Sequence, residues 1–189
     1  MKTTHKTKST IHNSPVVQSG VPALPKPQAE HEWLQQFVGE WDSRTESHLD
    51  LDRHPEEGKA FERILPLGGF WVVNDIDAEM MGKPFHGIQT LGYDVNKKAF
   101  IGTWVDSMSC VVWTYKGALN PERTALTLYS EGPCPTSPDR LTKVKDVLEL
   151  IDRNHKLYTS YILDNHGDWS LCMEARGVLR KSTGDATAG

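Results

Sequence analysis

Short stretches of strand-forming residues recur along the chain from Trp41 to Arg180, at a spacing of about ten residues. Clusters of Gly, Pro, Asn and Asp separate these stretches and are typical of tight turns. No helical pattern of roughly 10 to 15 residues lies between them, so parallel β-α-β units are disfavoured. The spacing therefore predicts an all-β protein, an antiparallel meander that closes on itself as a barrel.

We expect about ten strands in this meander. Their predicted bounds are 41–49, 59–66, 70–79, 84–93, 99–106, 110–117, 123–130, 141–151, 155–163 and 169–180. The longest break, residues 132–138, contains three prolines and is expected to form a stiff loop near one mouth of the barrel. Side chains do not fill the interior of a barrel of more than eight strands completely. The strand number therefore predicts a cavity.

One short helix is expected before the first strand, over residues 27–38. It begins with a proline and carries Glu30 and Glu32 near its positive end, and Gly39 follows as a left-handed cap. Its apolar residues lie on one face and are Trp33, Leu34, Phe37 and Val38. This face has to pack against the end or the side of the barrel.

The chain of 189 residues is long enough for one domain with tails. Residues 1–26 hold few large apolar residues, so we expect a disordered basic tail there, a single β-barrel domain over 27–181 and a flexible C-terminus over 182–189. Four of the 21 basic residues and none of the 25 acidic residues lie within the first 29, so the remainder carries a formal charge of −8. An acidic body disfavours binding to nucleic acid.

Several observations concern the compartment of the protein. No apolar run reaches the roughly 18 to 20 residues that cross a bilayer, so no membrane association is expected, and the N-terminus lacks the apolar segment of a secretory signal. Cys110, Cys134 and Cys172 are odd in number and widely spaced, as expected for reduced thiols. These features predict a cytoplasmic protein. They identify no cofactor and no oligomeric state.

Several motifs occur in a defined order along the chain. Gly39-Glu40-Trp41 resembles the G-x-W signature that opens the first strand of lipocalin-like (calycin) barrels. Five further blocks follow it and are Leu67-Gly68-Gly69-Phe70-Trp71-Val72-Val73, Leu91-Gly92-Tyr93-Asp94, Gly102-Thr103-Trp104, Ser130-Glu131-Gly132-Pro133 and Asp146-Val147-Leu148-Glu149. Together with the helix they resemble a bacterial family of uncharacterised proteins, domain of unknown function 1579, over residues 30–181.

This resemblance implies a lipocalin-like barrel in which Trp41 is buried where the helix meets the first strand. It implies no activity and no catalytic residue. Haem-binding barrels of the calycin type are similar in outline, but the chain contains no matching haem-ligand motif.

Aromatic residues are the main candidates for ligand contacts. An indole or phenol offers a large apolar wall and one polar group, so aromatics inside a barrel could line a pocket. The alternative is ordinary core packing. The ligand-binding candidates are Trp71, Tyr93, Trp104, Trp113 and Tyr115.

Ionisable residues within the predicted strands are candidates for acid–base chemistry, above all His86, Asp106 and Glu131. Cys172, Glu174 and Arg176 alternate onto one face of the last strand, which we expect to be the exterior or to hold an ion pair. Carboxylates also alternate at residues 75, 77 and 79, as expected for a solvated strand face. The chain has neither a metal-ligating histidine motif nor a G-x-S-x-G nucleophile motif.

Three functions are compatible with these features. The leading hypothesis is a barrel whose interior binds a small, partly apolar molecule. The second is an enzyme that uses the same cavity, with His86 or Glu131 as the acid–base group and Asp106 as its partner. The third is a non-catalytic interaction module with a filled barrel. An open apolar cavity, converging ionisable groups or an exposed apolar patch would distinguish the three.

Overall fold

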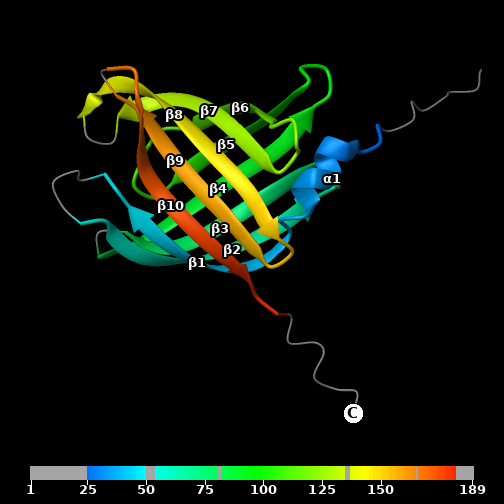
Figure 1. Cartoon of the computed structure of the whole chain (residues 1–189), viewed down its shortest axis with the longest axis horizontal. Coiled ribbons are helices and arrows are strands. Elements are labelled where there is room, and N and C mark those ends of the chain that lie inside the picture. The colour runs from blue at the N-terminus through cyan, green and yellow to red at the C-terminus, as the bar shows by residue number, and fades with distance from the viewer. Residues whose placement is uncertain (1–24, 50–53, 81, 135–136, 165, 182–189) are drawn as a thin grey trace, which may run out of the picture.

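The computed structural model forms a closed barrel of ten antiparallel strands, preceded by one short helix (Figure 1). It describes residues 25–49, 54–80, 82–134, 137–164 and 166–181. Consecutive strands pair with each other, and β1 pairs with β10 to close the sheet, so the order is a simple meander. The predicted fold class is confirmed.

The strands correspond closely to the stretches predicted from the sequence. Their bounds are β1 Gly39–Ser47, β2 Glu56–Leu67, β3 Trp71–Met80, β4 Lys83–Asp94, β5 Ala99–Asp106, β6 Trp113–Leu119, β7 Ala125–Cys134, β8 Ser137–Asp152, β9 His155–Leu163 and β10 Trp169–Leu179. The helix, α1, spans Ala29–Gln35.

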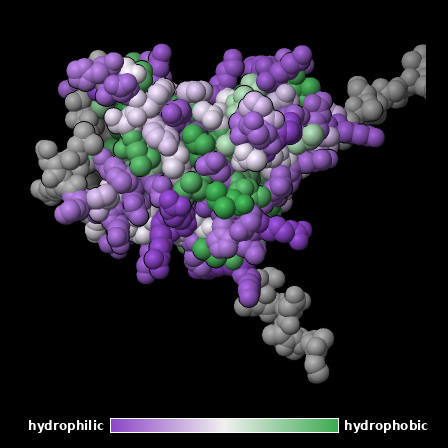
Figure 2. Space-filling model, in the orientation of Figure 1, coloured by the Kyte–Doolittle hydropathy of each residue, from purple (hydrophilic) through white to green (hydrophobic). Residues whose placement is uncertain are grey.

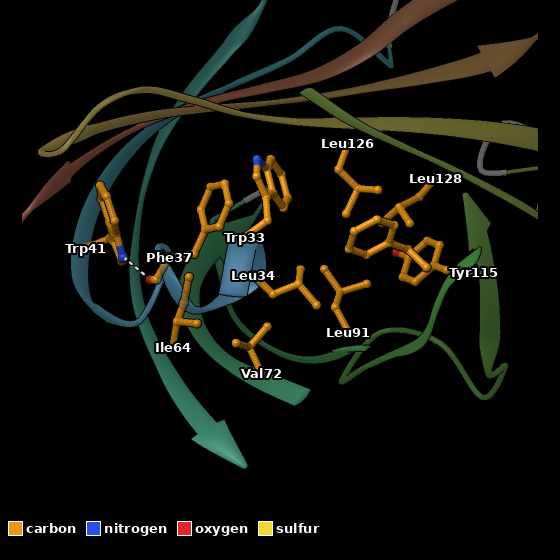
Figure 3. Packing of buried hydrophobic residues seen from close by; sticks show 11 residues of the cluster. Trp33, Leu34, Phe37, Trp41, Ile64, Val72, Leu91, Tyr115, Leu126 and Leu128 are labelled. Carbon is orange, nitrogen blue, oxygen red and sulfur yellow. Dashed lines mark hydrogen bonds between the residues drawn. The ribbon is translucent and has the colours of Figure 1, made fainter. Parts of the chain in front are cut away.

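Helix α1 closes one end of the barrel. Its apolar side chains project between the strands, and Trp33, Leu34 and Phe37 are almost completely buried (Figure 3). They pack against apolar residues at the adjacent strand ends, namely Ile64, Val72, Leu91, Phe100, Leu126 and Leu128. The main apolar core is therefore at this end of the barrel.

Polar contacts hold the helix in place. The ring of the buried His31 bridges the backbone, because its Nδ1 accepts from the Gln28 amide at 2.9 Å and its Nε2 lies 3.1 Å from the Tyr93 carbonyl oxygen. Arg123, at the β6–β7 turn, contacts the helix twice. Its carbonyl oxygen accepts a hydrogen bond from the Trp33 indole at 2.8 Å, and its guanidinium pairs with Glu30 at 3.0 Å. These contacts fix α1 across the barrel end.

The G-x-W resemblance correctly placed Trp41. Its side chain is 0% exposed, and its indole nitrogen donates to the Phe37 carbonyl oxygen at 2.9 Å (Figure 3). This bond joins the first strand to the segment that follows the helix. The predicted link between helix and barrel is confirmed.

The proline-rich segment at 132–138 differs from its prediction as a separate loop. Strand β7 continues to Cys134 and β8 begins at Ser137, so the described part of this segment belongs to the two strands of a long hairpin, and residues 135–136 lie outside the described residues. A register shift between Pro133 and Cys134 accommodates the irregular backbone. The predicted terminal segments, residues 1–26 and 182–189, fall almost entirely outside the described residues.

The last strand shows how a bulge changes which side chains share a face. Glu174 and Arg176 lie on the outer surface and form an ion pair at 2.8 Å, as predicted. Cys172 is buried instead, because the pairing register shifts between Leu171 and Met173. The expected common face of Cys172, Glu174 and Arg176 was therefore wrong for the cysteine.

The outer surface is largely hydrophilic in the view of Figure 2, with small apolar groups between charged side chains. Among the described residues, no helix has the length and apolar character needed to cross a bilayer.

Candidate ligand site in the barrel lumen

The inward-facing side chains change from apolar to polar along the barrel axis. Next to the helix the inward positions are apolar, but the next inward position on most strands is polar. Strand pairing places these polar residues beside the apolar residues of neighbouring strands. Glu62 lies opposite Trp41, Asn74 lies opposite Ile64, and Asp146 lies opposite Leu128. We call them the polar layer, and its members are Ser43, Glu62, Asn74, Gln89, Tyr115, Ser130, Asp146, Lys156, Tyr158 and Ser160.

A buried ion pair occupies one side of the polar layer. The ammonium of Lys156 on β9 lies 2.5 Å from Glu62 Oε2 on β2, and both side chains are less than a tenth exposed. Ser43 Oγ and Asn74 Nδ2 also donate to this carboxylate, at 2.6 and 2.8 Å. Burial alone raises the pKa of Glu62, but Lys156 and the two neutral donors lower it overall. The Glu62 carboxyl is therefore ionised at neutral pH, and its charge opposes the lowering of the Lys156 pKa by burial.

A second buried carboxyl, that of Asp146 on β8, occupies the other side without a cation. The residue is 3% exposed, and its Oδ1 has no hydrogen-bond partner among the described residues. Burial raises the pKa of Asp146, although the hydroxyls of Ser160, Tyr158 and Tyr115 oppose this effect. Burial also holds the pKa values of both tyrosines well above their usual range, so they remain neutral hydrogen-bond donors.

Two more polar atoms in the layer lack partners. The side-chain oxygens of Asn74 and Ser130 are buried and make no hydrogen bond within the described part of the chain. Buried polar groups are nearly always satisfied in folded proteins, and an unsatisfied one costs about 1 to 3 kcal/mol. Three such atoms, including Oδ1 of Asp146, therefore belong to inward-facing side chains of β3, β7 and β8.

Indole rings line the lumen beyond the polar layer. A Cβ atom on Gly132 would lie 2.5, 2.6 and 2.7 Å from three ring atoms of Trp113, so this ring lies face-on against the glycine. The Trp104 ring covers Gly87 in a similar way and stacks on Phe85. Glycine allows each indole to lie along the wall rather than across the barrel. The centre of the lumen is therefore not blocked by these large side chains.

Several inward-facing side chains retain solvent exposure. Gln89, Trp104, Trp113 and Tyr158 are all half-buried although they point into the barrel. Because the surrounding sheet shields the inner face, this exposure is toward open space in the lumen or its mouth. At the barrel end opposite α1, a depression of about 460 Å³ lies against β1, β2 and β3, and it is lined mainly by side chains of the outer face. Among the described residues, its lining includes the glutamates Glu46, Glu56, Glu57 and Glu79 and the basic residues Arg44 and Lys59.

The structure brings four of the five predicted aromatic candidates into the barrel. Trp104, Trp113 and Tyr115 line the lumen on β5 and β6, where Trp104 pairs with Trp113. Tyr93 also points inward but packs edge-on against His31 and Phe100 beneath the helix. Trp71 lies on the outer face, because the neighbouring Val72 is the inward residue of β3.

The three acid–base candidates do not meet in the lumen. His86 lies on the outer surface, where its ring contacts Asp77 at 2.9 Å and Asp75 at 3.5 Å. Glu131 is exposed on the outer face of β7. Asp106 points toward the mouth, but its carboxylate already accepts bonds from the Trp104 indole and the Met108 amide. The geometry therefore does not assemble the catalytic group predicted from the sequence.

The strongest candidate residues were missed by the sequence analysis. Glu62, Asp146 and Lys156 were not predicted as site residues, although each lies two positions from another inward-facing residue of its strand and therefore shares its face. Asp146 lies between Val144 and Leu148 in the alternating pattern. A charged residue in phase with apolar neighbours on both sides was the available signal.

The Cys172 thiol is not an activated nucleophile, and the described residues hold no metal site. Burial raises the pKa of the Cys172 thiol to about 11, so the thiol stays protonated and donates to the Ser160 carbonyl oxygen. No group of three metal-ligating side chains occurs within the described ranges. The site is suited to binding by hydrogen bonds, charge and aromatic contact.

The sequence matches, over residues 26–178, the family described as "Protein of unknown function (DUF1579)". The chain belongs to this family. The match agrees with the resemblance drawn from the ordered motifs, and it spans the helix and the ten strands except for the last residue of β10. No curated protein matches the chain.

Two solved structures resemble this DUF1579 barrel. The S-type phycobiliprotein lyase CPES from Guillardia theta is 16% identical with a TM-score of 0.55, and the comparison covers 82% of this chain and 99% of that one. Rv2717c from M. tuberculosis is 12% identical with a TM-score of 0.58, and the comparison covers 82% of this chain and 100% of that one. At such low identity these similarities establish the barrel fold alone.

Proposed function

We propose that this DUF1579 protein binds a small, partly apolar organic molecule in its barrel lumen. The observation that carries the proposal is that three inward-facing side chains, Asn74, Ser130 and Asp146, each hold a buried polar atom with no hydrogen-bond partner among the described residues. A ligand whose polar groups reach these atoms would remove their desolvation penalty, while the indole walls would bury its apolar part. The barrel of the CPES lyase shows that the same fold occurs in a protein named for chemistry on phycobiliproteins.

The two alternative functions receive less support. The acid–base candidates lie apart, and the tyrosines, the cysteine and the ion pair of the lumen include no nucleophile next to a base. An interaction module requires no lumen, whereas the half-buried inward side chains border open space.

A lumen-blocking variant tests the proposal. Ala175 on β10 faces the lumen opposite Tyr158, so Ala175→Phe adds a ring inside the barrel. Ala118 on β6 is exposed on the outer face, so Ala118→Phe is the matched control. Native mass spectrometry would identify any co-purifying molecule, and calorimetry with 1-naphthalenemethanol would measure occupancy by a neutral probe.

We expect saturable binding of 1-naphthalenemethanol to the full-length chain and to Ala118→Phe, and at least ten-fold weaker binding to folded Ala175→Phe. Equal binding to both variants would place the probe outside the lumen and contradict the proposal. Absence of both a co-purifying molecule and probe binding would also contradict it.

A further inference from the structure

The polar layer contains more acidic groups than cations to balance them. Its ionisable groups are Glu62, Asp146 and Lys156, together with two tyrosines that stay neutral. Lys156 is the cation of the layer, and it is already paired with Glu62. Asp146 therefore has no cationic partner within this layer.

The groups packed around Asp146 do not supply a positive charge either. Tyr115 approaches it from β6, Tyr158 and Ser160 approach it from β9, and the Cys172 thiol of β10 is close enough to feel its charge. All four are neutral at physiological pH. A carboxylate buried without a counter-charge is unfavourable, and the usual remedies are protonation or a cation from outside the chain.

Aromatic and electrostatic features near Asp146 also favour a cation. Trp113 and Tyr115 are successive inward residues of β6, and the Trp113 ring lies flat on Gly132 with its other face directed away from the wall. Such a face attracts cations through its quadrupole. At the end of the barrel opposite α1, four glutamates and two basic residues line the described part of the outer depression, so this end also attracts positive charge.

We propose that the lumen ligand is a small apolar amine whose protonated nitrogen donates to Oδ1 of Asp146. This inference rests on the proposed lumen-binding function and specifies its ligand class. The ammonium would balance the buried carboxylate and lie near the indole face of Trp113, and the apolar part would extend along the aromatic wall. Amines would therefore bind more tightly than alcohols or carboxylates of the same shape.

A matched series of probes tests this preference without any mutation. The series is 1-naphthylmethylamine, 1-naphthalenemethanol and 1-naphthoate, which at pH 7 are a cation, a neutral alcohol and an anion on the same ring. We expect calorimetry to show the amine binding at least ten-fold more tightly than the alcohol, with the carboxylate weakest. If the alcohol binds as tightly as the amine, the ligand class is wrong although lumen binding stands. If no probe binds, both proposals are contradicted.

Asp146→Asn assigns the preference to a residue. This nearly isosteric change removes the negative charge, so we expect the affinity for the amine to fall at least ten-fold and that for the alcohol to change little. Asp77→Asn makes the same substitution on the outer face and should leave both affinities unchanged. An amine preference that survives in folded Asp146→Asn would overturn the assignment.

Discussion

Removal of the Lys156 ammonium provides a sharp test of the polar layer. In Lys156→Met the Glu62 carboxylate would keep its bonds from Ser43 and Asn74 but lose the one charged partner that it has among the described residues. Both side chains of the pair are less than a tenth exposed, so the carboxylate would be left buried without a counter-charge. Breaking a buried pair in this way costs about 3 to 5 kcal/mol, a large part of the roughly 5 to 15 kcal/mol that stabilises a typical domain.

The double variant Glu62→Gln/Lys156→Met is expected to recover most of this loss. The neutral amide can still accept from Ser43, and a flip of the Asn74 amide would let its free Oδ1 accept from the new amide group. We therefore expect the double variant to be within about 2 kcal/mol of the wild type, since replacing both charges removes the uncompensated one. Urea denaturation followed by circular dichroism would give the free energies of unfolding.

The pH dependence supplies a second readout for Lys156→Met. Without the ammonium, burial raises the folded-state pKa of Glu62 above its unfolded value, so stability is present at low pH and is lost as pH rises through the folded pKa. The deficit relative to the wild type should therefore shrink from pH 7 to about pH 5, by up to about 1.4 kcal/mol per pH unit. A deficit below about 1 kcal/mol at pH 7, or one equal to that of the double variant, would refute the argument.

Two further variants test other parts of the fold. Trp41→Ala should lower the free energy of unfolding by about 3 to 5 kcal/mol through a cavity and the lost bond to Phe37, and an unchanged denaturation midpoint would contradict its buried position. Burial raises the folded-state pKa of Asp146, so the contribution of this carboxyl to the stability of the folded protein decreases as pH rises. The free energy of unfolding of Asp146→Asn relative to the wild type should therefore increase from about pH 4 to pH 7. A constant difference between the two would argue against the raised pKa.

The location of the strands could be predicted from the sequence because it depends on local chemistry. Strand β9 was predicted at 155–163 and is observed at His155–Leu163, since the Asp152-Arg153-Asn154 turn and the alternation around it are local signals. The position of Trp41 also followed from a short motif beside a helix. The structure of the chain near Pro133 was harder to predict, because prolines indicate an irregular backbone both in a loop and at a bulged strand end.

The composition of the candidate site could not be predicted in the same way. Alternation divides a strand into two faces, but it does not say which face is inside. Trp71 and Trp104 looked equivalent in the sequence, yet pairing across β3, β4 and β5 directs Trp71 outward and Trp104 inward. A bulge likewise moved Cys172 off the face of Glu174. Each of these assignments depends on the register with a neighbouring strand.

The sequence by itself therefore predicted a meander of ten strands and one helix before it, since turn residues, strand propensity and periodicity act over a few positions, and the resemblance of Gly39-Glu40-Trp41 to the G-x-W signature implied a core tryptophan. Only the closed barrel decided that Lys156 meets Glu62 across 94 residues of chain, and that Asp146 is buried with no cation beside it in the described part of the chain. Burial and electrostatic pairing arise when distant strands enclose a common interior. The charges of the lumen therefore became a site only through the tertiary structure.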